Sequence, residues 1–173
     1  MSTGKRKSSQ PFWETKKLDE LSREQWEALC DRCAKCCLIK LEFEDTGQLC
    51  YTQLVCRYYD EQSSTCTCYG ERTVLVPTCV KLTPQNLSAV HFMPSTCAYR
   101  LLFEGKCLPW WHHLVSDSPE TVHAAGGSIR GRVLCEDLAD PEDWEEHIVD
   151  WVEYGWIGVH MKQARQTQGL PGE

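Results

Sequence analysis

Four cysteines stand within eight residues of this 173-residue chain, at Cys30, Cys33, Cys36 and Cys37. The spacing Cys-x2-Cys-x2-Cys-Cys lets one turn of chain present two sulfurs to one ion, and thiolate is the soft ligand preferred by zinc and iron–sulfur clusters. A straight helix over these residues would separate its ends by about 10 Å, whereas sulfurs on one zinc ion lie about 4 Å apart. If these thiols share one centre, the helix must therefore break after about Cys33 and the chain must curl.

Cys36 and Cys37 are neighbours in sequence. Their Cα atoms are about 3.8 Å apart across a trans peptide, which is shorter than the usual disulfide span. In extended chain the two side chains point to opposite sides. We expect one of them to ligate a first centre and the other to serve a second centre or pack inside, and the sequence leaves the assignment open.

Five further cysteines stand where the chain can turn around a metal. Cys66-x-Cys68 lies in a Ser/Thr-rich turn, Cys56 follows a strand-like run, and Cys79 and Cys97 each follow a proline by two or three residues. Four thiols close one zinc site, so these positions allow one or two sites. The remaining cysteines lack such surroundings and are expected to be ordinary thiols: Cys50, Cys107 and Cys135.

Cysteine makes up about 7% of the chain (12 of 173 residues), near the level of disulfide scaffolds in short secreted proteins. The N-terminal sequence MSTGKRKSSQPFW has no apolar signal segment, and no stretch approaches the ~20 apolar residues of a membrane span. We therefore expect a cytoplasmic protein with reduced thiols that bind metal or carry out redox chemistry. A disulfide scaffold is the alternative if the chain is exported by another route.

The chain has a net charge of −7, and seven acidic residues fall between Glu136 and Glu146. A surface of this sign repels phosphate backbones. We therefore expect the partner to be a metal ion or cluster and not nucleic acid or a membrane. The sequence identifies no protein partner.

The spacing of Cys30, Cys33 and Cys36 matches the first three ligands of a bacterial ferredoxin run, although the closing x3-Cys-Pro is missing. Structural zinc sites favour two separated Cys-x2-Cys pairs, and one region alone supplies such pairs here. The spacing therefore favours iron, as an iron–sulfur cluster of the [4Fe–4S] type or as iron alone, over zinc. Among the histidines, His112-His113 is the best candidate for an outside ligand, although an ordinary core or surface role is commoner.

Local patterns predict short helices and a hairpin. Ser22 caps a helix that runs into Cys30, and Gln25 completes a capping box. Residues 41–59 alternate loosely and predict a hairpin with its turn near Gly47. Thr73–Val76 is a candidate strand.

Three more helices are expected further along the chain. Thr83-Pro84 predicts the start of one, and Ala98–Phe103 forms another that ends near Gly105. Asp140-Pro141 opens the last, whose apolar face consists of Trp144, Ile148, Trp151 and Val152.

We expect a small, irregular α+β domain over residues 11–160, in which short helices and a small antiparallel sheet pack around the metal site. Polar tails are expected at residues 1–10 and 161–173.

Several long motifs resemble one known family, the YcgN family of bacterial cysteine-cluster proteins. The resemblance covers about residues 11–115 and rests on PFWETKKLDELSREQWEALCDRCAKCCLIKLEFEDTG, YTQLVCRYYD, TCTCYGER, PTCVKLTPQNL and MPSTCAYRLLFEGKCLPWWHHL. The wider superfamily is described as a zinc- or iron-chelating domain with a CxxCxxCC signature. Some of its members are iron–sulfur proteins, and a related cluster occurs in flagellin lysine methylases.

The resemblance implies a bacterial cytoplasmic protein and a set of nine metal-binding cysteines: Cys30, Cys33, Cys36, Cys37, Cys56, Cys66, Cys68, Cys79 and Cys97. It implies no reaction, and catalytic residues stay unassigned. The function that we expect is metal binding for electron transfer, redox sensing or metal handling. The alternatives are a zinc-stapled structural or interaction protein and a component of an oxidoreductase or modification enzyme.

Overall fold

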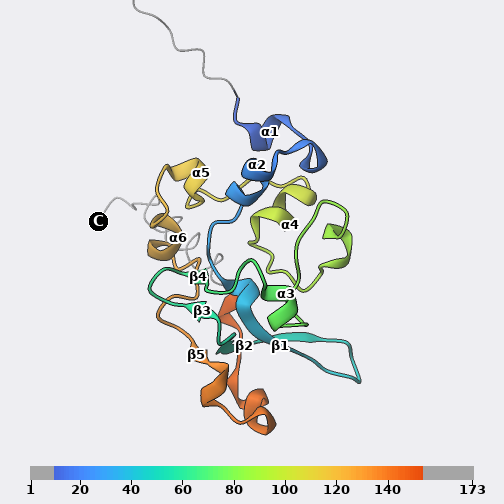
Figure 1. Ribbon diagram of the computed structural model, residues 1–173, viewed down its shortest axis with the longest axis vertical. Helices are drawn as coiled ribbons and strands as arrows, with labels where there is room; N and C mark the ends of the chain where they lie inside the picture. Colours follow the sequence, from blue (N-terminus) through green and yellow to red (C-terminus); the bar gives the residue numbers. More distant parts are fainter. Residues whose placement is uncertain (1–9, 154–173) are drawn as a thin grey trace, which may run out of the picture.

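The computed structural model describes residues 10–153 of the chain. Most of the labelled helices gather toward one end of the molecule, whereas α3 lies beside the main sheet, nearer the other end (Figure 1). The helices are α1 (Phe12–Thr15), α2 (Arg23–Ala28), α3 (Arg72–Leu75), α4 (Ala98–Phe103), α5 (His113–Ser116) and α6 (Thr121–Ala124). The 3-10 segments are η1 (Leu18–Glu20), η2 (Lys35–Cys37), η3 (Leu87–Ala89), η4 (Glu136–Leu138) and η5 (Pro141–His147). The predicted polar tails, apart from Gln10, lie outside the described residues, and the single-domain boundaries stay a prediction.

The strands form two small sheets. They are β1 (Leu38–Glu42), β2 (Leu49–Val55), β3 (Tyr59–Asp60), β4 (Thr65–Cys66), β5 (Leu134–Cys135) and β6 (Ile148–Val149). Strand β2 pairs antiparallel with β1 and β6 and parallel with β5, while β3 and β4 form a separate antiparallel pair. The expected α+β class of short helices and small antiparallel sheets is confirmed, with one short parallel pair in addition.

The predicted hairpin is formed by β1 and β2. Gly47 has a φ of 64°, in the left-handed region that glycine adopts without steric cost, and its N–H donates to Phe43 O at 2.7 Å. The first strand begins at Leu38, earlier than expected, and the second ends at Val55, directly before Cys56. The hairpin therefore joins two cysteine-bearing segments of the chain.

Two helix ends follow their local signals. The Ser22 hydroxyl accepts from Gln25 N at 3.2 Å and Ser22 N donates to Gln25 Oε1 at 3.1 Å, so the predicted capping box of α2 is confirmed. Helix α4 ends where Gly105, with a φ of 71°, donates to Leu102 O at 3.1 Å. Lys106 N also donates, to Leu101 O at 2.8 Å, which completes a Schellman motif.

Three local predictions were wrong. Thr73, Val74 and Leu75 belong to helix α3 and Val76 is its C-cap, because this segment has no strand to pair with and closes its hydrogen bonds locally. The helical turn expected at Thr83-Pro84 begins later, at Leu87. Asp140 does cap the last helix, but this is a 3-10 segment that ends at His147, after which β6 pairs with β2.

Two apolar clusters form the core. The first contains Leu29, Leu87, Val90, Met93, Cys97 and Tyr99, and the second contains Ala34, Leu38, Tyr51, Val55, Ile129 and Val152. The chain passes from the first cluster at Leu29 to the second at Ala34, so the segment that contains Cys30 and Cys33 spans the space between them. In the described part of the chain, no helix reaches the length and apolarity that a membrane span requires.

Candidate metal centre

The segment between α2 and β1 lies at the centre of the molecule (Figure 1) and has an unusual backbone. Helix α2 ends at Ala28, and Arg32 and Ala34 both have a φ of 58°. Left-handed backbone costs a residue with a side chain about 1–2 kcal/mol. The chain therefore curls as expected for a shared site, but the helix breaks before Cys30 and not after Cys33. Strain of this kind persists where surrounding contacts hold it.

Three contacts hold this curled segment. Asp31, which is 8% exposed, accepts with Oδ1 from Cys33 N at 3.1 Å. Ile129 N donates to Cys33 O at 3.0 Å. The Nε2 atom of fully buried His112 lies 3.0 Å from Leu29 O, just before Cys30.

His112 uses both ring nitrogens for backbone contacts. Leu114 N donates to its Nδ1 at 3.2 Å, so the proton is on Nε2, which donates to Leu29 O. The candidate outside ligand thus serves as a core histidine that positions the cysteine segment. His113 stacks on His112 with ring centroids 4.6 Å apart, and burial lowers the pKa of His113.

A buried lysine links Cys97 to the curled segment. Lys35 is 1% exposed, and its Nζ donates to Thr96 Oγ1 at 3.1 Å and to Val152 O at 2.8 Å. Thr96 directly precedes Cys97, the N-cap residue of α4. The contact therefore anchors α4 beside a segment that lies about sixty residues earlier.

The first thiol group consists of four cysteines: Cys30, Cys33, Cys36 and Cys97. What they share is that negative charge on Cys36 raises the pKa of each of the other three. Burial raises the pKa of the Cys30 and Cys97 thiols to about 12 each, and it raises the pKa of Cys33 well above its ordinary value. These thiols are protonated at neutral pH without metal, so metal binding here must release protons.

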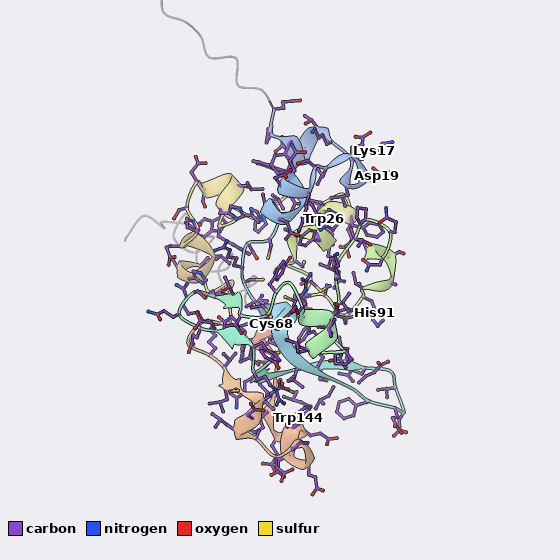
Figure 2. All side chains as sticks on the ribbon, in the orientation of Figure 1. Lys17, Asp19, Trp26, Cys68, His91 and Trp144 are labelled. Carbon is purple, nitrogen blue, oxygen red and sulfur yellow. The ribbon has the colours of Figure 1, made fainter. Side chains whose placement is uncertain are left out.

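The second thiol group consists of five cysteines: Cys37, Cys56, Cys66, Cys68 and Cys79. The sulfurs of Cys66 and Cys68 lie 3.6 Å apart at the end of the β3–β4 pair, near the centre of the molecule (Figure 2). Cys56 N donates to Cys37 O at 3.0 Å, and Cys79 interacts with the charges on Cys36 and Cys66. Desolvation raises the pKa of Cys68 to about 11.

The two groups meet at Cys36 and Cys37, whose sulfurs lie 4.0 Å apart. Their mutual hydrogen bond lowers the pKa of Cys36 and raises that of Cys37, because the thiolate of one accepts from the thiol of the other. Neighbouring residues thus contribute to different groups. That all nine cysteines bind metal stays a prediction.

All twelve cysteines are free thiols. Cys50 pairs with Leu41 across the hairpin, Cys135 lies on β5 opposite Val55, and Cys107 is exposed after α4. Within residues 10–153, no three His, Cys, Asp or Glu side chains are arranged closely enough to hold one metal ion as they stand.

Sequence reasoning missed the polar residues that support the thiols. Asp31 and Lys35 stand inside the cysteine run, where two charged residues could have suggested a role. For His112 the sequence left a ligand role and an ordinary core role open, and it gave no sign of a role for Lys40. The contacts of Lys35 and His112 join residues that are distant in sequence, whereas those of Asp31 and Lys40 lie within four residues.

A cysteine-rich chelating domain is the class that the comparisons define. Residues 29–98 match the family model CxxCxxCC, described as "Putative zinc- or iron-chelating domain". This span contains all nine cysteines of the two thiol groups and leaves out Cys107 and Cys135.

Curated bacterial relatives match most of the chain. A UPF0260 protein of Parvibaculum lavamentivorans is 55% identical over 83% of this chain and 94% of its own length. UPF0260 protein mll2411 of Mesorhizobium japonicum is 54% identical over 81% of this chain and 96% of its own length. A UPF0260 protein of Marinobacter nauticus is 51% identical over 82% of this chain and 96% of its own length. The chain belongs to the UPF0260 family, so the expected resemblance to YcgN-like cysteine-cluster proteins is confirmed. No solved structure matches it.

Proposed function

We propose that this protein binds iron, as an iron–sulfur cluster, at the first thiol group and a second metal centre at the neighbouring second group. The observation that carries the proposal is the position of Cys97. The run from Cys30 to Cys36 supplies three ligands at ferredoxin spacing and lacks the fourth. The Lys35–Thr96 contact supports Cys97, which directly follows Thr96, as the fourth ligand.

The donor chemistry fits such a group. The thiols of the first group are free, and cysteine thiolate is the usual ligand of an iron–sulfur cluster. A bound cluster would supply one-electron chemistry, which suits electron transfer, redox sensing or metal handling in a bacterial cytoplasm. The chain itself orients the ligands through Asp31, Lys35 and His112.

A zinc centre at the second thiol group is the other candidate. Sulfurs on one zinc ion lie about 4 Å apart, and the sulfurs of Cys66 and Cys68 are 3.6 Å apart. A zinc ion there would close the β3–β4 pair against Cys37 and stabilise the fold without any chemistry of its own. If zinc also occupied the first group, the protein would be a zinc-stapled structural or interaction protein.

An enzyme role has less support. A groove between the N-terminal segment and α4 is lined by Lys17, Asp19 and Phe103 among others, and no cysteine lines it. Lys17 and Asp19 lie at the helical end of the molecule (Figure 2), so this groove gives no reason to place a substrate at the thiols.

Oxygen-free purification tests the proposal through iron, zinc and acid-labile sulfide analysis and a visible spectrum. We expect brown protein that contains iron and sulfide. Colourless protein with one or two equivalents of zinc and no iron would instead establish the zinc-stapled alternative.

Single Cys→Ser variants test the two groups separately. Cys33→Ser is expected to lower the iron and sulfide content, whereas Cys68→Ser is expected to lower the metal content of the second group and spare the first. The matched control, Cys107→Ser, should keep the full metal content. Loss of metal in this control would show that the ligand assignment is wrong.

A further inference from the structure

Lys40, in the middle of β1, holds its ammonium group at the junction of the two thiol groups. Its Nζ donates to Cys36 O at 3.0 Å and to Leu38 O at 2.8 Å. The rings of Tyr51 and Phe92 lie beside it, with centroids 5.7 Å and 6.0 Å from Nζ. Two carbonyls and two rings therefore fix the position of a partly buried positive charge.

Three cysteines and Tyr51 are the ionisable neighbours of this ammonium group. Cys36, Cys37 and Cys79 lie close enough to interact with its charge, and both of its hydrogen-bond acceptors are neutral carbonyls. Among residues 10–153, no carboxylate forms an ion pair with Lys40, in contrast to Arg57, Arg100, Lys106 and Arg130. Taking a charge out of water costs free energy unless an opposite charge lies nearby. The cysteines beside Lys40 would supply that charge as thiolates when they bind metal, because metal binding displaces their protons.

We propose that Lys40 is a charge-compensating residue shared by both metal centres. This inference rests on the proposed function. Four thiolates around a divalent ion leave two net negative charges, and the charge around an iron–sulfur cluster is one determinant of its reduction potential. Cys36 belongs to the first group, whereas Cys37 and Cys79 belong to the second, so one ammonium group serves both.

A purely structural role for Lys40 makes different predictions. The pairing of β1 with β2 is irregular between Leu38 and Lys40, and the lysine could simply hold this irregular start of the strand. In that case a neutral hydrogen-bond donor at this position would keep metal binding at the wild-type level. Charge compensation, by contrast, requires the positive charge itself.

Three variants separate charge from hydrogen bonding. Lys40→Arg keeps the charge and the donors, Lys40→Gln keeps a donor without charge, and Lys40→Met removes both. Lys106→Gln removes an exposed lysine after α4 and serves as the control. The full-length proteins are purified without oxygen, and circular dichroism checks that each one folds.

Metal content, competition with a chelator and the midpoint potential of bound iron are then measured. Second-shell substitutions typically weaken metal affinity by roughly 10- to 100-fold. We expect such a loss for Lys40→Gln and Lys40→Met, at both groups, together with a more negative potential of bound iron. Lys40→Arg and Lys106→Gln should behave like wild type.

Wild-type affinity and potential in a folded Lys40→Gln variant would overturn the inference and leave the proposed function intact. A loss confined to one group would overturn the shared role. Wild-type protein without stoichiometric metal would instead overturn the proposed function, and this inference with it.

Discussion

His112 Nε2 donates to the carbonyl oxygen of Leu29 across 83 residues of sequence, and both residues are fully buried. Leu29 lies between the end of α2 and Cys30. Because the other ring nitrogen accepts from Leu114 N, one imidazole fixes the start of α5 and the start of the cysteine segment. A change at this position therefore affects the orientation of the thiols.

We expect His112→Ala to lower the free energy of unfolding of the metal-free protein. The buried Leu29 carbonyl would lose its hydrogen-bond donor, which costs about 1–3 kcal/mol of stability. The cavity left by the imidazole ring would destabilise the protein further. Urea denaturation measures the change. His91→Ala, at an exposed histidine, is the control, and an equal effect in both variants would contradict the prediction.

The left-handed backbone of Arg32, with a φ of 58°, predicts an order of stability among substitutions. Arg32→Val should destabilise the metal-free protein by about 1–2 kcal/mol, because a β-branched side chain tolerates this conformation poorly. Arg32→Gly should be close to wild type, since relief of the backbone strain offsets the entropy of glycine in the unfolded chain. Thermal unfolding of both variants provides the measurement, and the prediction fails if valine is as stable as glycine.

Gly127 leaves little room for a side chain. An added Cβ would lie 3.1 Å from both Trp111 Nε1 and Val122 O, whereas a Cβ at Gly70 would meet nothing within 4 Å. We expect Gly127→Ala to destabilise the fold by about 1–3 kcal/mol through overpacking, and Gly70→Ala to have little effect. Urea midpoints of the two alanine variants test this, and similar midpoints would count against it.

Acidification should destabilise the metal-free protein through His123. Burial lowers the pKa of this histidine below its ordinary value of 6.5, and its Nδ1 lies 2.7 Å from Ser128 Oγ. The His123 imidazole is therefore protonated at a higher pH in the unfolded chain than in the folded protein. The contribution of His123 to stability is complete above pH 6.5 and is lost as the pH falls through the lowered pKa of the folded state.

Melting temperatures between pH 7.5 and 5 measure this effect, and comparison with a variant that lacks the imidazole isolates the contribution of His123. The His123→Gln variant should show a shallower decline than wild type. Identical declines in the two proteins would show that another group is responsible.

The sequence by itself determined the elements whose hydrogen bonds close within a few residues. Ser22 and Gln25 cap α2 from three positions apart, and Gly105 ends α4 through contacts with the preceding turn. The α+β class followed from local sequence patterns, and the family followed from the resemblance of several long motifs to known proteins. Thr73–Val76 shows the limit, because whether its β-branched residues form a strand depends on a neighbouring strand that local sequence does not specify.

Only the tertiary structure decided that Cys97 lies beside the segment that contains Cys30 to Cys37. Lys35 reaches Thr96 across 61 residues and Val152 across 117, and these contacts place Cys97 beside a segment far from it in sequence. Leu29 and Ala34 are buried in different apolar clusters, so the residues between them cross the centre of the molecule. Such contacts depend on how separate apolar surfaces pack together, and packing between distant segments leaves no periodic signal in the sequence.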